Sequence, residues 1–197
     1  MSNTTVNLSK NMRVDLTKRH DDLQNLLVGL GWESPKEPVN GYKFDLDASV
    51  LLLDANGKCS DADNFIFYGN PLSKCGAVKC GKDNKDGTGE GDDEQVSIKR
   101  LLLDPKHEIL RFLVSIHDAE ARGHDFGKVK DAYFRIEDQD TGQTLFRFSL
   151  TEDYKPETGV VLVDLYREGG NWKIRAVGQG YREGLHGILK EVGLQVG

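Results

Sequence analysis

The stretch from Asp83 to Glu94 is the part of the sequence with the clearest capacity for chemistry. Its twelve residues carry six carboxylates, one side-chain amide, three glycines and one lysine. Glycine at positions 87, 89 and 91 disfavours a helix or strand, so the segment is predicted to be a loop. Crowded carboxylates repel one another unless a cation neutralises them, and calcium takes about six to eight oxygen ligands in flexible geometry. A metal-binding loop is the first hypothesis, and a solvated acidic loop is the alternative.

A second pair of carboxylates, Asp45 and Asp47, occupies alternate positions of a predicted strand. Phe44, Leu46 and Ala48 would point to one face of that strand and the two aspartates to the other. Aspartate is uncommon in strands, and two on one face repel each other without a counter-cation. The pair is predicted either to ligate a metal or to lie on an exposed sheet edge.

Polar residues also gather where another alternating strand ends, in the order His117, Asp118, Glu120. Loops at strand ends often carry binding residues, so Asp118 and Glu120 could complete an oxygen shell around the acidic loop. His117, His124 and Asp125 form a transition-metal alternative, because imidazole suits zinc or nickel. A half-buried histidine with no metal is the simpler interpretation of this stretch.

Motifs typical of catalysis are missing from the sequence. It has no Gly-x-Ser-x-Gly elbow, phosphate-binding loop, His-Glu-x-x-His pair or dinucleotide-binding fingerprint. The acidic loop does not follow the EF-hand pattern either. Glycoside hydrolysis needs two isolated carboxylates with separated pKa values, which a crowded loop does not provide. We therefore expect a protein that is not an enzyme.

Length and charge exclude several classes of protein. The 197 residues fit a single domain with a sizeable core, and the net charge of −6 argues against nucleic acid as a partner. No apolar run is long enough to cross a membrane and no signal peptide is visible, so we expect a cytoplasmic protein with no direct membrane insertion. The odd number of cysteines, at 59, 75 and 80, predicts reduced thiols, and Cys75 and Cys80 are expected in a loop-like stretch close to the acidic loop.

Short alternating or apolar runs separated by turn signals predict a mainly β protein, a two-sheet antiparallel β-sandwich with a short C-terminal helix. The helix is predicted over Glu183 to Val192, with Gly193 ending it, and a single helical turn over Ala119 to Arg122. The predicted strands are 6–10, 14–18, 26–32, 44–50, 64–68, 110–117, 132–136, 144–150, 160–166 and 172–177.

Several blocks of the sequence, in the same order, resemble the TerD family of tellurium-resistance and stress-response proteins. Besides the acidic loop, these blocks are Val6–Lys10, Leu27–Trp32, Phe44–Ser49, Asp61–Tyr68, Ile116–Arg122 and Ala176–Tyr181. The resemblance extends over nearly the whole chain and implies a single TerD-like domain over residues 1–197.

The resemblance to the TerD family also implies a cofactor and partners. It implies a β-sandwich that binds calcium, with two ions, and a role in resistance to tellurite, phage and pore-forming colicins. It implies complexes with other Ter-family proteins, including an integral membrane partner, which would bring the protein to the inner face of the membrane. It implies no enzymatic activity.

By position, the resemblance assigns the metal ligands to three places in the chain: the acidic loop, the strand pair and the strand end. These residues are Asp83, Asn84, Asp92, Asp93 and Glu94, then Asp45 and Asp47, then Asp118 and Glu120. The loop departs from the family pattern, because Lys82 precedes Asp83, Asp86 replaces a threonine and Thr88 replaces a glutamate.

The leading functional prediction is a calcium-ordered interaction module of the stress response. Calcium would draw the carboxylates together and shape a surface for partner proteins. One alternative is a metal-independent acidic module that docks a basic partner. The other is a protein that binds a small ligand such as a nucleotide or an oxyanion.

Overall fold

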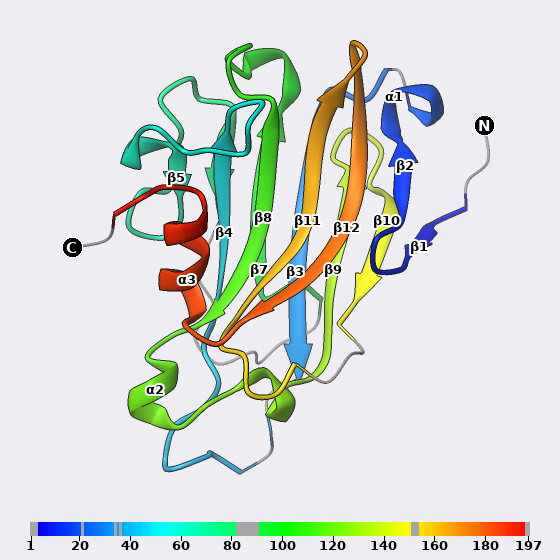
Figure 1. Ribbon diagram of the computed structural model, residues 1–197. Coiled ribbons are helices and arrows are strands. Elements are labelled where there is room, and N and C mark those ends of the chain that lie inside the picture. The colour runs from blue at the N-terminus through cyan, green and yellow to red at the C-terminus, as the bar shows by residue number, and fades with distance from the viewer. Residues whose placement is uncertain are drawn as a thin grey trace.

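Two β-sheets packed face to face form the body of the protein (Figure 1). The computed structural model describes residues 4–20, 22–33, 35, 37–81, 91–150 and 154–195. Sheet A contains, in spatial order, β1 (Val6–Leu8), β10 (Gln143–Ser149), β9 (Lys130–Asp138), β3 (Asn25–Glu33), β7 (Glu94–Lys99) and β6 (Val78–Cys80). Sheet B contains β2 (Arg13–Asp15), β12 (Asn171–Tyr181), β11 (Gly159–Glu168), β8 (Ile109–Ile116), β4 (Leu46–Leu53) and β5 (Phe65–Ile66).

The predicted β-sandwich is confirmed, with one difference in strand direction. Sheet B is antiparallel throughout, whereas sheet A is mixed because β1 runs parallel to β10. The first two predicted strands therefore belong to different sheets, β1 joining sheet A and β2 joining sheet B. Short helical elements connect or follow the strands: α1 (Leu16–Arg19), η1 (Ala62–Asn64), η2 (Arg100–Leu102), α2 (Ala119–Arg122), η3 (Phe126–Lys128) and α3 (Gly184–Glu191).

Apolar side chains fill two layers. The larger core lies between the sheets and includes Leu26, Phe112 and Phe134. A second cluster covers the outer face of sheet B, where Ile188 and Leu189 of α3 pack on residues of β4, β8 and β11. The predicted C-terminal helix thus closes one outer face of the sandwich, and the other outer face, that of sheet A, remains for polar residues.

Three predictions about local structure were wrong at their boundaries. The second N-terminal strand stops at Asp15, because the carboxylate of Asp15 accepts a hydrogen bond from the backbone N–H of Lys18 (2.9 Å) and starts α1. Glu94 is the first residue of β7 and not the last of a loop, since Val96 and Ile98 alternate into the core. Cys80, expected in a loop, belongs to β6.

Candidate functional site

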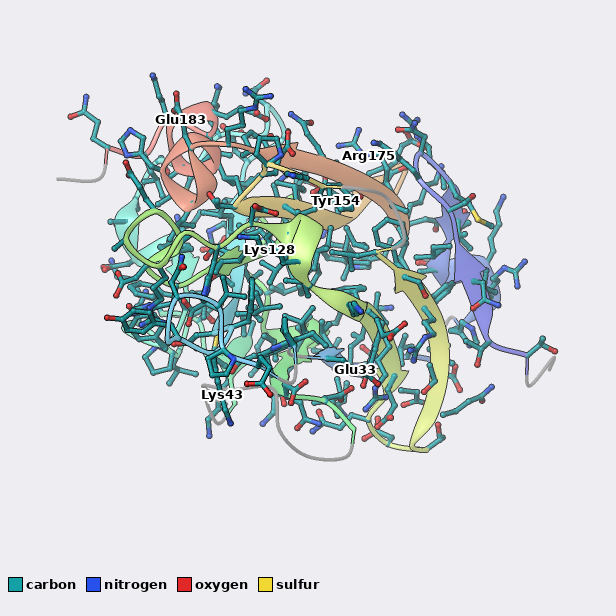
Figure 2. All side chains as sticks on the ribbon, turned by 90° about the horizontal axis from the view of Figure 1, so that it is seen from below. Glu33, Lys43, Lys128, Tyr154, Arg175 and Glu183 are labelled. Carbon is teal, nitrogen blue, oxygen red and sulfur yellow. The ribbon has the colours of Figure 1, made fainter. Side chains whose placement is uncertain are left out.

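One end of the sandwich gathers most of the described candidate ligands. At this end, the lower one in Figure 1, β3 ends and α2 follows β8. Leu46 at the start of β4 pairs with Ile116 at the end of β8, and Glu94 at the start of β7 pairs with Leu30. Figure 2 looks onto this end of the sandwich from below, where Lys128 lies between Glu183 on one side and Lys43 on the other. Strand register therefore brings the predicted carboxylates to one end.

Asp45, Asp47 and Asp118 converge on two basic side chains. The Nδ1 of His117 lies 3.5 Å from Asp47, and its Nε2 lies 3.3 Å from Asp118. The guanidinium of Arg122 lies 3.7 Å from Asp45 and 3.5 Å from Asp118. The side chains of Asp45 and Asp47 are only 13% and 14% exposed, so the exposed-edge interpretation of this pair does not hold.

Asp118 and Glu120, the predicted ligands at the end of β8, differ in their contacts with this cluster. Asp118 is 61% exposed and adopts a left-handed conformation with φ of 49°, at the point where the chain turns from β8 into α2. Glu120 follows on the exposed side of α2. Asp118 thus belongs to the cluster of Asp45 and Asp47, and no contact joins Glu120 to that cluster among the described residues.

Asp92 lies on the outer face of sheet A and is held by three side chains. Arg135 donates to its two oxygens from Nε (2.8 Å) and Nη2 (2.6 Å), Tyr133 donates from its hydroxyl (3.0 Å) and Gln95 from its amide (3.1 Å). The side chain of Asp92 is only 1% exposed. A Cβ on Gly29 would lie 2.2 Å from this carboxylate, so glycine in β3 makes the room that Asp92 occupies.

These contacts set the charge states around Asp92. Burial raises the pKa of Asp92, but the hydrogen bonds from Arg135 and Gln95, the charge of Arg135 and the Tyr133 hydroxyl outweigh burial and lower it. Burial and the charge of Asp92 raise the pKa of Tyr133 to about 12. At neutral pH the pair is therefore a carboxylate and a neutral phenol, and Asp92 is tied to sheet A by charge-assisted bonds.

The next two acidic residues continue into β7. The carboxylate of Asp93 accepts the backbone N–H of Trp32 (3.0 Å), and its own N–H donates to the carbonyl of Leu30 (2.9 Å). Glu94 lines a narrow gap between the sheets together with Ala48. The three described acidic residues of this stretch therefore point in different directions, and among them Glu94 turns towards the interior.

The structure separates the predicted ligands into two groups. Asp47 lies on the outer face of sheet B, because its neighbours Leu46 and Ala48 face the core, whereas Asp92 lies on the outer face of sheet A. Asp83 and Asn84 lie outside the described residues. Within the described ranges, no three His, Cys, Asp or Glu side chains are arranged to hold a metal ion. The described carboxylates alone thus do not form a complete calcium site.

The transition-metal alternative joins residues with different surroundings. His124 is buried, stacks on Phe44 with ring centroids 4.0 Å apart, and has its Nε2 3.2 Å from the carbonyl of Val39. Asp125 caps η3 by accepting the N–H of Gly127. His117 faces the aspartates of β4 and α2 instead, so the structure does not bring the two histidines together.

The three cysteines are free thiols, as predicted. Burial, reinforced by the charge of Glu94, raises the pKa of Cys80 to about 12, and burial also raises the pKa of Cys59. Burial acts in the same direction on Cys75, but hydrogen bonding from Ser73 and nearby backbone groups lowers its pKa overall. Cys75 is therefore the thiol with the greatest thiolate character.

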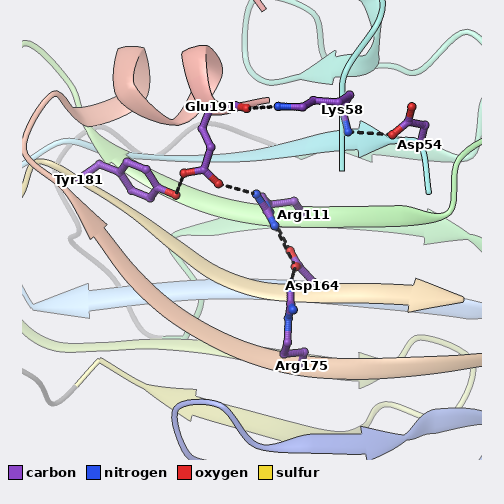
Figure 3. A network of polar contacts seen from close by, with 7 residues as sticks. All are labelled: Asp54, Lys58, Arg111, Asp164, Arg175, Tyr181 and Glu191. Atoms are coloured by element: carbon purple, nitrogen blue, oxygen red, sulfur yellow. Dashed lines mark hydrogen bonds and ion pairs between the residues drawn. The ribbon is translucent and has the colours of Figure 1, made fainter. Parts of the chain in front are cut away.

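A polar network on the outer face of sheet B was not predicted from the sequence (Figure 3). Asp164 is 1% exposed and accepts from Arg111 (2.9 and 3.1 Å) and from Arg175 (2.5 Å). Glu191 of α3 accepts from Arg111 (3.5 Å) and from the hydroxyl of Tyr181 (2.5 Å). This network ties three strands to α3, and its only sequence signal is a lone aspartate within an apolar strand.

A family model for the TerD domain matches residues 4–191. The chain belongs to the TerD family. General stress protein 16U of Bacillus subtilis is 44% identical over 98% of this chain and 100% of its own length. The tellurium resistance protein TerD of Serratia marcescens is 43% identical over 96% of this chain and 98% of its own. The resemblance inferred from the sequence blocks is thereby confirmed.

A solved structure shows that this TerD-family chain has a known fold. It is that of a homologue of the telluride resistance protein TerD from Streptomyces coelicolor A3(2), which superposes with a TM-score of 0.62 at 18% identity. The superposition covers 81% of this chain and 90% of that one. Within the described residues, no helix combines the length and apolar character needed to span a membrane.

Proposed function

We propose that this TerD-family protein is a calcium-binding module of the stress response that supports tellurium resistance. The observation that carries the proposal is the convergence of Asp45, Asp47 and Asp118 at the end of the sandwich where β7 begins. Calcium, when bound, would supply positive charge that offsets the repulsion among these carboxylates and those of segment 83–94. The names of the relatives support the stress and tellurium part.

The positions of the carboxylates favour two ions over one. Asp47 lies on the outer face of sheet B, whereas the acidic segment joins sheet A at Asp92, so we assign these two places to different ions. Asp45, Asp47 and Asp118 would serve one ion after turning away from His117 and Arg122, because in their present arrangement they do not enclose a metal site. Asp83, Asn84 and Glu94 would serve the other ion. Asp92 and Asp93 would mainly hold the acidic segment to sheet A, because their oxygens already accept from Arg135 and from the N–H of Trp32.

Calorimetric titration of chelator-treated protein with calcium tests the proposal. We expect saturable binding at about micromolar concentration or below, retained at 150 mM salt and not reproduced by magnesium. Asp83→Ala should abolish one binding event and Asp47→Asn the other. Asp22→Asn, an exposed aspartate near the opposite end of β3, is the matched control and should bind like the wild type.

The absence of saturable binding would overturn the calcium proposal. Weak association that disappears with salt would instead favour the metal-independent acidic docking module. Equal binding by Asp83→Ala and the wild type would mean that calcium binds elsewhere.

We further propose that the calcium-bound form associates with other Ter-family proteins. One of these would be an integral membrane protein, which would bring this chain to the inner face of the membrane. Exposed Tyr42 and Tyr68 border the carboxylate cluster, Tyr42 beneath the guanidinium of Arg122 (5.4 Å) and Tyr68 beside His117 (6.5 Å). Tyrosine and arginine are enriched at protein interfaces.

Sedimentation of the protein with a purified Ter-family partner tests this association. We expect a complex with calcium and none with chelator. A complex under both conditions would contradict a calcium-controlled module.

A further inference from the structure

A basic hollow lies at the end of β9 and β10, on the far side of sheet A from β6. It has a volume of about 640 Å³ and is lined by three cations, Lys130, Arg147 and Lys155, against one acid, Asp131. Its apolar wall includes Phe126 and Leu150. In a chain with a net charge of −6, an excess of positive charge in one concave place is a local departure from the overall balance.

Arg147 and Arg135 are cross-strand neighbours in sheet A that differ in their acidic partners. The two arginines pair across β10 and β9, so both point to the outer face. Arg135 is neutralised by Asp92 and by Glu137. Among the residues that the structure describes, no carboxylate pairs with Arg147, whose cation is therefore available to a ligand.

The guanidinium of Arg147 is held in position by an aromatic ring. It lies 3.8 Å from the ring centroid of Tyr133, close enough for a cation–π interaction. The ring is itself restrained, because its hydroxyl donates to Asp92 and its edge fills the space left by Gly31. An arginine restrained in this way loses less side-chain freedom when it binds an anion.

Further donors extend the basic hollow along β10. Ser149 follows Arg147 on the same face, since it pairs with Tyr133. Both residues also line an adjoining hollow of about 300 Å³, together with Ser9 and Lys10 at the end of β1. A guanidinium fork, ammonium groups and hydroxyls are the donors that bind phosphate oxygens in proteins.

We propose that the basic hollow binds a small, multiply charged oxyanion of the phosphate class. The guanidinium of Arg147 would bind two oxygens of the anion, Lys130 would balance its charge and Ser149 would donate a hydrogen bond. Such a ligand could be a free polyphosphate or the phosphate group of a nucleotide. The site does not involve the carboxylates assigned to calcium, so the anion-binding proposal can be tested separately from the calcium proposal.

Titration of calcium-free protein with inorganic pyrophosphate tests the site. We expect saturable binding at 150 mM sodium chloride that weakens about tenfold in Arg147→Gln and in Lys130→Gln, because each variant removes one charge-assisted contact. Lys79→Gln, an exposed lysine of β6 at the opposite edge of sheet A, is the matched control and should bind like the wild type. Amide resonances of 130–132 and 147–150 should shift, and those of 94–99 should not.

Other results would overturn the basic-hollow proposal. It fails if pyrophosphate does not bind saturably, or if Lys130→Gln, which changes only an exposed side chain, binds as tightly as Lys79→Gln. A parallel titration with adenosine diphosphate identifies the source of the phosphate. Tighter binding of the nucleotide indicates that base and ribose also make contacts, and equal or weaker binding indicates a free polyphosphate.

Discussion

At the scale of single residues, the acidic stretch divides into different roles. Asp92 is part of the packed outer face of sheet A, where Arg135 and Tyr133 hold it and Gly29 makes room for it. Asp93 bonds to the backbone of β3, and Glu94 begins β7. Loss of charge at Asp92 or Asp93 should therefore affect stability before it affects any ligand.

Asp92→Asn should lower the free energy of unfolding by about 3 kcal/mol at neutral pH, because it leaves the half-buried Arg135 with one fewer partner. The folded-state pKa of Asp92 is lowered, so its contribution is complete above the unfolded pKa of about 3.9 and is lost as the pH falls through the folded value. Urea unfolding of wild type and variant should give curves that differ at pH 7 and begin to converge only below about pH 4.

The exposed carboxylate Asp22 provides the control for Asp92. Asp22→Asn should unfold within about 0.5 kcal/mol of the wild type at every pH. A loss at Asp92 no greater than this would show that the bonds from Arg135 contribute little to stability.

At the scale of elements, α3 and sheet B form a unit of their own. Ile188 and Leu189 are buried on the outer face of sheet B, and Glu191 joins the row of Arg111 and Asp164 (Figure 3). The apolar side of α3 and its acidic residue Glu191 therefore both contact the outer face of sheet B. The helix is therefore held by burial, with the ion pairs setting its position along β8.

Ile188→Ala should lower the free energy of unfolding by about 3 kcal/mol, since it leaves a cavity beneath a fully buried side chain. Chemical denaturation monitored by circular dichroism measures the change. Lys190→Ala, on the exposed side of the same helix, should change stability by about 0.5 kcal/mol or less. Equal effects of the two variants would contradict the docking of α3 by its apolar face.

At the scale of the whole molecule, the N-terminal segment connects the two sheets at one edge. β1 pairs with β10 in sheet A, β2 pairs with β12 in sheet B, and Thr17 accepts the N–H of Trp172 (2.8 Å). Each short strand covers an edge that would otherwise present unpaired backbone groups. Stability and solubility should therefore both depend on this segment.

Removal of residues 2–9 should lower stability by about 2 kcal/mol, because it exposes the site of buried Leu8, and should lower the melting temperature by roughly 6 °C. Removal of residues 2–18 should lower it further and cause self-association through the bare edges of β10 and β12. Calorimetry and size-exclusion chromatography measure the two effects. A long truncation that remains monomeric with an unchanged melting temperature would contradict this role.

The amino-acid sequence by itself determined the fold class, most strands, the C-terminal helix and the family. These features depend on local alternation, turn residues and family blocks, which are visible along the chain. The strand β7 was not predicted because its alternation begins at the last of six crowded carboxylates. The helix α1 was not predicted because a cap at Asp15 interrupts a β-like pattern.

Only the tertiary structure decided which charged residues meet. The bonds between Asp92 and Arg135, or between Arg111 and Asp164, join positions 43 and 53 residues apart. They depend on strand register and on which face each side chain takes, and a shift of one residue would reverse every face. For the same reason the sequence alone did not reveal the basic hollow, whose cations come from β9, from β10 and from Lys155 beyond it.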